Sequence, residues 1–169
     1  MSDGDTELER LAQAVGEALL ARGWMLAAAE SCTGGWVAAA VTAIDGSSRW
    51  FERGFVTYSN EAKMDLLEVP AETLATHGAV SEATVRAMAA GALAHSRAQV
   101  ALSISGIAGP TGGTPEKPVG TVWHGWAVSG GAVDARLHHY AGDRRTVRRQ
   151  AVVTALQGVL DLLAEPVSA

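Results

Sequence analysis

Apolar residues recur along the chain at two spacings, one typical of helices and one typical of strands. The first helical stripe comprises Leu8, Leu11, Val15 and Leu19. Thr6 and Glu9 have the spacing of a capping box, which predicts that this helix begins near them. Gly23 stands where a C′ glycine commonly follows a helix, which predicts where it ends.

Further segments show helical spacing. Helices are expected over 36–44, 81–93 and about 143–163, with shorter helical segments over 60–67 and 70–77. Ser81 is the expected N-cap of the helix that follows it, because its hydroxyl can accept a hydrogen bond from a free N–H of the first turn.

Five shorter apolar runs have the length and composition of strands, namely 24–29, 54–58, 99–105, 119–128 and 133–140. Helices separate the first three, so these are expected to be parallel, whereas the last two flank a Gly-Gly turn and are expected to form an antiparallel hairpin. The predicted fold class is α/β, a three-layer α/β/α sandwich with a mixed five-stranded sheet in one domain over 1–169. Ligands gather at the carboxyl ends of strands in such sheets, so the loops 30–35 and 106–114 are expected to share one edge.

Composition narrows the class of protein. Of 169 residues, 48% are hydrophobic and 18% are charged, so a disordered chain is excluded. The formal net charge of −5 makes the chain a poor binder of nucleic acid, and no nucleic-acid partner is expected. No apolar stretch reaches about 18 residues, and the acidic N-terminus lacks the apolar region of a secretory signal, so no membrane partner is expected.

Two weaker expectations come from individual residue types. Cys32 is the only cysteine, which favours a reducing, cytoplasmic location. The apolar composition and the five Trp residues favour a homo-oligomer. No spacing of His, Cys and acidic residues suggests a metal site, and no cofactor is expected.

Ser31 is the first candidate for chemistry, because it lies just after a buried strand and just before a helix. Gly34 and Gly35 allow a tight bend and a close approach to a ligand. A helix N-terminus offers free N–H groups that can hold an oxyanion, which suits a nucleophile. Two alternatives stay open: Ser31 or Thr33 simply caps the helix, or Cys32 is the nucleophile, activated by the same helix end.

Lys63 is the candidate base for such a serine, since the five His residues show no catalytic arrangement. A lysine can act as a base only where burial or a nearby cation lowers its pKa. Tyr58 and Ser59 lie close by in sequence and could supply a relay of hydroxyls. The alternative is a solvated helix lysine paired with Glu61 or Asp65.

A run of four arginines begins the last helix, in the string D-R-R-T-V-R-R over 143–149. Cations at a helix N-terminus oppose the helix dipole, and arginine suits bidentate binding of phosphate. We therefore expect a bound phosphate there, contacted by Arg145 or Arg144. The alternative is a solvated face paired with acidic residues, and Arg148 and Arg149 fit that description. The loop 106–114 is rich in glycine and could line the same pocket with the hydroxyl of Thr111, although it matches no nucleotide-binding motif. The alternative is that this loop is a flexible connection.

Five strings in the chain carry a resemblance to a known family. They are A-E-S-C-T-G-G-W (29–36), G-F-V-T-Y-S-N-E-A-K (54–63), G-A-V-S-E (78–82), S-I-S-G-I-A-G-P-T-G-G (103–113) and K-P-V-G-T-V-W (117–123). Together they resemble the CinA C-terminal family, and in particular its single-domain members that hydrolyse nicotinamide nucleotide. The resemblance covers nearly the whole chain.

The resemblance implies an amidase that converts nicotinamide mononucleotide to nicotinic acid mononucleotide and ammonia in pyridine-nucleotide salvage, on a fold similar to anticodon-binding domains. It implies that Ser31 is the nucleophile and Lys63 the general base, assisted by Tyr58. The substrate-binding positions that it implies are Thr33, Gly34, Gly35, Asn60, Gly106, Ala108, Gly109, Thr111, Gly112 and Arg145. Two alternatives remain, an amidase that depends on Cys32 and a nucleotide-binding module without turnover.

Overall fold

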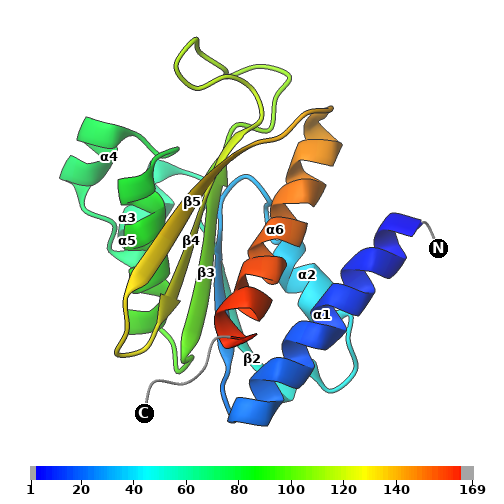
Figure 1. Ribbon diagram of the computed structural model, residues 1–169. Helices are drawn as coiled ribbons and strands as arrows, with labels where there is room; N and C mark the ends of the chain where they lie inside the picture. Colours follow the sequence, from blue (N-terminus) through cyan, green and yellow to red (C-terminus); the bar gives the residue numbers. More distant parts are fainter. Residues whose placement is uncertain (1–2, 165–169) are drawn as a thin grey trace.

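A five-stranded sheet forms the centre of the molecule, with its strands in the order β2-β1-β3-β4-β5 (Figure 1). The computed structural model describes residues 3–164. The strands are β1 (Leu26–Glu30), β2 (Phe51–Val56), β3 (Val100–Gly106), β4 (Thr121–Val128) and β5 (Val133–His139). β1 pairs in parallel with both β2 and β3, whereas β4 is antiparallel to β3 and β5. The predicted mixed sheet is therefore confirmed.

Within the described residues, six α-helices cover the sheet, three on each face (Figure 1). They are α1 (Asp3–Arg22), α2 (Trp36–Thr42), α3 (Asn60–Leu67), α4 (Ala71–His77), α5 (Glu82–Ala94) and α6 (Arg144–Ala164). α1, α2 and α6 enclose one hydrophobic core against the sheet, and α3, α4 and α5 enclose a second core against the opposite face. The predicted α/β/α sandwich is confirmed.

The connections between the parallel strands decide where a ligand can bind. The chain passes from β1 to β2 through α2 on one face, and from β2 to β3 through α3, α4 and α5 on the other. The two crossovers run in opposite directions along the sheet and on opposite faces of it, so a crevice opens at the carboxyl ends of β1 and β3. The loops 30–35 and 106–114 both leave the sheet at this edge, as expected.

Several predicted boundaries are wrong in detail. α1 is already helical at Asp3, so Thr6 and Glu9 lie inside it and form no capping box at its start. β2 spans Phe51–Val56 rather than 54–58, because the chain leaves the sheet before Tyr58 to begin α3. The predicted end of α1 is correct: Gly23 has a φ of 67°, and its N–H donates to the carbonyl of Leu20.

Candidate active site

A pocket of about 290 Å³ lies at the carboxyl ends of β1 and β3. Its wall is made by the turn after β1, the start of α3, the turn between α4 and α5, the loop after β3 and the first residue of α6. The lining residues are Ser31, Cys32, Tyr58, Lys63, Ala79, Val80, Ser105, Gly106, Ile107, Ala108, Gly109, Thr111, Gly112 and Arg144. The volume is close to the lower end of the range for small-molecule sites.

Ser31 and Lys63 meet in this pocket, although 32 positions separate them in the chain. The Nζ of Lys63 lies 3.0 Å from the Oγ of Ser31. Ser31 is fixed to the sheet because its N–H donates to the carbonyl of Ile104 in β3 at 3.0 Å. A nucleophile and a candidate base are thus within hydrogen-bond distance, which is the geometry that a serine needs for activation.

Lys63 is only 1% exposed, and two backbone carbonyls hold its amine. Nζ donates to the carbonyl of Thr57 at 2.8 Å and to that of Tyr58 at 3.3 Å. Burial lowers the pKa of Lys63 below its usual 10.5, against a weaker opposing effect of Cys32. A neutral amine has two N–H bonds and one lone pair, so two carbonyl partners leave the lone pair for the hydroxyl of Ser31. The solvated lysine paired with Glu61 or Asp65 is contradicted.

Local sequence explains why Lys63 points inward. Ser59 is the N-cap of α3, and its hydroxyl accepts a hydrogen bond from the N–H of Ala62 at 3.0 Å. The helix therefore begins directly after the two carbonyls that hold the amine. Lys63 and Leu67, one turn apart, are the buried residues of α3, so the lysine occupies the face of the helix that packs on the sheet.

Glu30 stabilises the turn that carries Ser31, and sequence reasoning missed it. Its side chain is 1% exposed and accepts the N–H groups of Val37 and Ala38 at 2.8 and 3.1 Å. The hydroxyl of Thr33 also donates to it at 2.6 Å. The N-terminus of α2 is thus capped by Glu30, not by Ser31 or Thr33, which leaves the Ser31 hydroxyl free. A lone carboxylate at the end of an otherwise apolar strand was the available signal.

Cys32 is buried, and burial raises the pKa of its thiol to about 11. Hydrogen bonds from backbone N–H groups and the charge of Arg148 lower the pKa, but less than burial raises it. A thiol reacts as its thiolate, which is scarce at neutral pH when the pKa is so high. The activation by a helix end that would favour Cys32 as the nucleophile is therefore outweighed by burial.

The four arginines of α6 have four different surroundings. Arg149 forms an ion pair with Glu7 at 2.8 Å. Arg148 donates to the carbonyls of Cys32 and Thr33 at 3.0 and 3.1 Å, and so fixes the turn after β1. The remaining two, Arg144 and Arg145, are adjacent in sequence but point to different places. The arginine run is therefore not one phosphate site.

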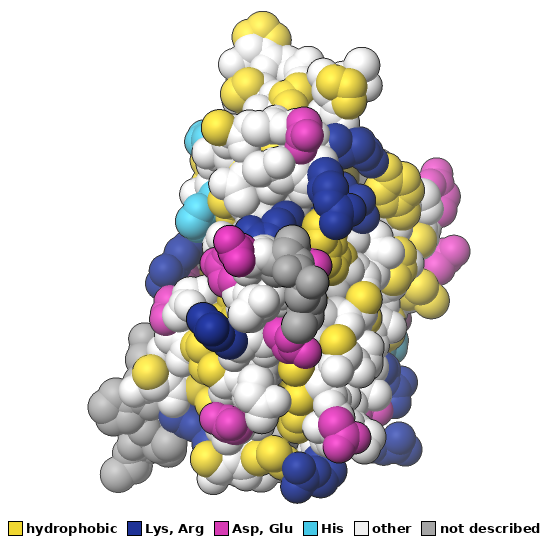
Figure 2. Space-filling view, turned by 90° about the vertical axis from the view of Figure 1, so that its right-hand side faces the viewer, with side chains coloured by type: hydrophobic (Ala, Val, Ile, Leu, Met, Phe, Trp, Pro, Cys, Tyr) yellow, Lys and Arg dark blue, Asp and Glu magenta, His cyan; other side chains and the backbone are white. Residues whose placement is uncertain are grey.

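Arg144, and not Arg145, lines the pocket. Its guanidinium donates to the carbonyl of Gly109 at 2.8 Å and to the hydroxyl of Tyr58 at 3.3 Å. Arg145 instead lies over the ring of Trp36, 5.3 Å from its centroid, and Arg148 lies at 5.5 Å from the same ring. On the face formed by α1, α2 and α6, Figure 2 shows Lys and Arg side chains gathered beside large hydrophobic ones near one end.

Tyr58 reaches Lys63 through its backbone and not through its hydroxyl. The side chain is 65% exposed, and its hydroxyl contacts Arg144. The predicted relay of hydroxyls from Tyr58 and Ser59 to Lys63 is therefore not formed, since Ser59 caps α3. Tyr58 contributes a carbonyl that holds the amine and a hydroxyl that holds the arginine.

The predicted substrate-binding residues fall into two groups. Those after β3 line the pocket, namely Gly106, Ala108, Gly109, Thr111 and Gly112. The others lie outside its lining, namely Thr33, Gly34, Gly35, Asn60 and Arg145. The side chain of Thr33 turns toward Glu30, and Asn60 is exposed at the start of α3. The N–H of Gly34 donates to the carbonyl of Ser31, so that group is already taken.

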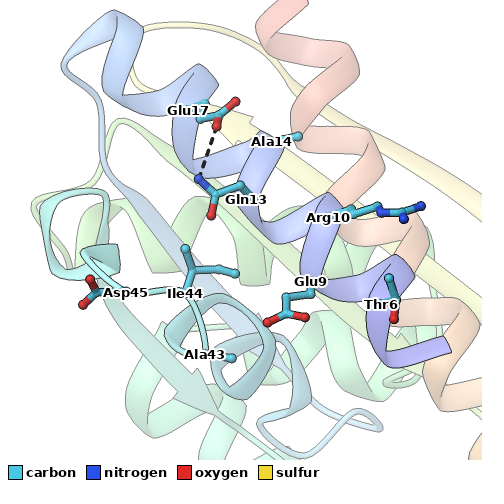
Figure 3. A pocket seen from close by; sticks show the side chains of 9 residues that line it. All are labelled: Thr6, Glu9, Arg10, Gln13, Ala14, Glu17, Ala43, Ile44 and Asp45. Carbon is cyan, nitrogen blue, oxygen red and sulfur yellow. Dashed lines mark hydrogen bonds between the residues drawn. The ribbon is translucent and has the colours of Figure 1, made fainter. Parts of the chain in front are cut away.

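A second, wider hollow of about 670 Å³ lies between α1 and the segment after α2 (Figure 3). Polar side chains line it, and Gln13 donates to Glu17 across one turn of α1 at 3.2 Å. Neither serine, cysteine, histidine nor lysine is among its lining residues in the described part of the chain. The candidate nucleophile Ser31 and the candidate base Lys63 both lie in the smaller pocket, which is therefore the candidate active site.

The fold and this pocket define an α/β/α protein with a buried serine–lysine pair at the carboxyl edge of a mixed sheet. The model of the CinA C-terminal domain family matches residues 8–163, so the chain belongs to that family. The relationship expected from the five strings is confirmed.

Relatives of the chain carry names that describe an activity. The chain is 60% identical over 153 residues to the nicotinamide-nucleotide amidohydrolase PncC of Escherichia coli K12, covering 90% of this chain and 93% of that protein. It is 54% identical to the PncC of Enterobacter agglomerans, covering 92% and 95%. The crystal structure of the competence/damage inducible protein CihA from Agrobacterium tumefaciens is similar, with a TM-score of 0.91, 46% identity and 94% and 96% coverage.

No helix within residues 3–164 has both the length and the apolar character needed to span a bilayer.

Proposed function

We propose that the chain hydrolyses the carboxamide of nicotinamide mononucleotide, releasing ammonia and nicotinic acid mononucleotide. The observation that carries this proposal is the contact of 3.0 Å between the buried amine of Lys63 and the hydroxyl of Ser31. The names of the relatives support the choice of substrate.

In the first half of the reaction, the neutral amine of Lys63 takes the proton of Ser31 while Oγ attacks the carboxamide carbon. A C–O bond forms, and the carbonyl electron pair moves to oxygen to give a tetrahedral oxyanion. The oxyanion collapses, the C–N bond breaks, and the protonated Lys63 gives its proton to the leaving nitrogen. Ammonia leaves, and an acyl-serine remains.

In the second half, water attacks the acyl-serine, and Lys63 takes a proton from the water. The bond between Ser31 and the acyl carbon breaks, and Lys63 returns the proton to Ser31 Oγ. The same buried amine serves as base and acid in both halves because its pKa is lowered by its surroundings. Thr57 and Tyr58 hold it in place through their carbonyls in either charge state.

Arg144 is the residue that we assign to the phosphate of the nucleotide. Its guanidinium lies on the pocket wall and is already oriented by Gly109 and Tyr58. Two of its five N–H donors are used there, so others remain for a phosphate oxygen. Binding at the phosphate aligns the distant carboxamide with Ser31, so nicotinamide without its ribose phosphate is expected to react poorly.

The test is release of ammonia from nicotinamide mononucleotide by the purified chain, with the acid product identified by mass spectrometry. Ser31→Ala is expected to abolish turnover while binding of the nucleotide is kept. The control is Ser129→Ala, in the exposed turn after β4, which is expected to turn over like the unaltered protein. Binding without ammonia release by the unaltered protein would favour the alternative of a nucleotide-binding module.

Three expectations accompany this function. The product would enter the salvage of pyridine nucleotides. The free thiol of Cys32 suits a reducing cytoplasm. Six large hydrophobic side chains are exposed in the described residues, which supports a homo-oligomer; they are Leu20, Val56, Tyr58, Leu66, Val119 and Leu137.

A further inference from the structure

The mechanism above needs a donor for the oxyanion, and several of the expected backbone donors are already in use. Gly34 donates its N–H to the carbonyl of Ser31. The N–H groups of Val37 and Ala38 donate to the carboxylate of Glu30. Three N–H groups at the N-terminus of α2 are thus engaged within the protein, which leaves room for a side-chain donor in the pocket to face the reacting carbonyl.

Three buried side-chain atoms within the described residues have no hydrogen-bond partner, namely Thr57 Oγ1, Ser105 Oγ and His124 Nδ1. Of these three residues, only Ser105 lines the pocket. Ser105 is 1% exposed, so its hydroxyl is shielded from bulk water and forms no hydrogen bond within the protein. A buried hydroxyl without a partner lowers the stability of the folded state, which calls for an explanation in terms of a ligand.

Strand register places Ser105 directly beside Ser31. Glu30 pairs with Ile104 in the parallel ladder, and the N–H of Ser31 donates to the carbonyl of Ile104. The next pair along the two strands is therefore Ser31 and Ser105, on backbones that lie about 4.8 Å apart in such a ladder.

The direction of the Ser105 side chain follows from its neighbour in the same strand. Ser103 points to the layer of α3, α4 and α5, because its Oγ donates to the carbonyl of Val85 in α5 at 2.6 Å. Residues two apart in a strand point to the same face. Ser105 therefore points to the layer from which Lys63 enters the pocket, and its hydroxyl faces the reacting centre without bonding to Ser31 or Lys63.

We propose that the hydroxyl of Ser105 donates a hydrogen bond to the carboxamide oxygen of the substrate and stabilises the oxyanion that forms when Ser31 attacks. This inference rests on the proposed amidase function. Ser105 takes no part in the transfer of the proton between Ser31 and Lys63, since its Oγ is outside that contact. Ser105 would then be a third catalytic residue beside Ser31 and Lys63, the two that the sequence indicated.

The experiment compares Ser105→Ala with the unaltered protein, using ammonia release from nicotinamide mononucleotide across a range of pH. Loss of one oxyanion donor is expected to lower kcat by about 100-fold or more, with KM nearly unchanged. The pH at which the rate falls on the acid side is expected to stay the same, because Lys63 is untouched. The melting temperature is expected to equal or exceed that of the unaltered protein, because no hydrogen bond is lost.

The matched control is Ser103→Ala, in the same strand and on the same face. It removes the bond to Val85, so its melting temperature is expected to fall by a few degrees while its kcat is kept. Unchanged kcat for Ser105→Ala, a rise in KM alone, or a fall in melting temperature matching that of the control overturns the proposal for Ser105. An unaltered protein that releases no ammonia overturns the amidase function and, with it, this inference.

Discussion

Replacing Lys63 by methionine tests the centre of the proposed mechanism. Methionine keeps an unbranched apolar side chain of similar length and lacks the amine that lies 3.0 Å from Ser31. None of the described residues that line the pocket is Asp, Glu or His, so the pocket contains no second carboxylate or imidazole base. General-base catalysis contributes about 10²–10⁴-fold, and here the same amine also protonates the leaving nitrogen. We expect kcat to fall by about 10⁴-fold, equivalent to about 5 kcal/mol of activation free energy.

The variant is expected to remain folded. The carbonyls of Thr57 and Tyr58 each lose a donor, which costs about 1 kcal/mol apiece. Removal of a buried amine offsets part of this cost, because its charged form is disfavoured at the site. Lys117→Met is the matched control: the chain has two lysines, and Lys117 donates to the carbonyl of His77 from an exposed loop. Its turnover is expected to match that of the unaltered protein.

The dependence of turnover and of stability on pH tests the role of Lys63 independently. The pKa of Lys63 is lowered from 10.5 by burial, so turnover is expected to rise with pH until the amine is neutral. Between the pKa in the folded state and 10.5, the unfolded chain binds more protons, so the free energy of unfolding rises with pH by up to about 1.4 kcal/mol per pH unit from this group. In Lys63→Met, we expect neither the rise in turnover with pH nor this contribution to the free energy of unfolding.

The assay is ammonia release from nicotinamide mononucleotide, combined with urea unfolding at several pH values. Turnover by Lys63→Met within about tenfold of the unaltered protein, well short of the effect of a general base, would refute the reasoning. So would an acid-side fall in rate that survives in the variant.

Three further variants test residues around Ser31 and Lys63. Cys32→Ala is expected to retain most turnover, because burial raises the pKa of the thiol to about 11; complete loss would make the thiol the nucleophile. Arg144→Ala is expected to raise KM for the nucleotide by about 10–100-fold, while the matched Arg145→Ala leaves KM unchanged; equal effects would contradict the assignment of the phosphate. Glu30→Ala is expected to lower the free energy of unfolding by about 2–4 kcal/mol, measured with urea, and an unchanged midpoint would mean that its capping bonds contribute nothing.

The features of this protein that depend on neighbouring residues in the sequence could be predicted. The turn after β1 could be located because a short apolar run followed by Gly34 and Gly35 ends a strand wherever it occurs. Ser31 was then a candidate by position alone. The order of strands and helices also predicted the sandwich and the edge at which the loops meet, because crossover connections obey general rules of handedness and direction.

Only the tertiary structure decided which of two neighbouring arginines lines the pocket. Successive helical residues point about 100° apart, so Arg144 reaches the pocket and Arg145 reaches Trp36 according to how α6 is rotated against the sheet. The buried state of Lys63, the cap supplied by Glu30 and the unpartnered hydroxyl of Ser105 depend on segments far apart in the chain. Periodicity is a local property that a sequence displays directly, whereas burial, charge state and hydrogen-bond partners are set by whichever distant residues the fold brings together.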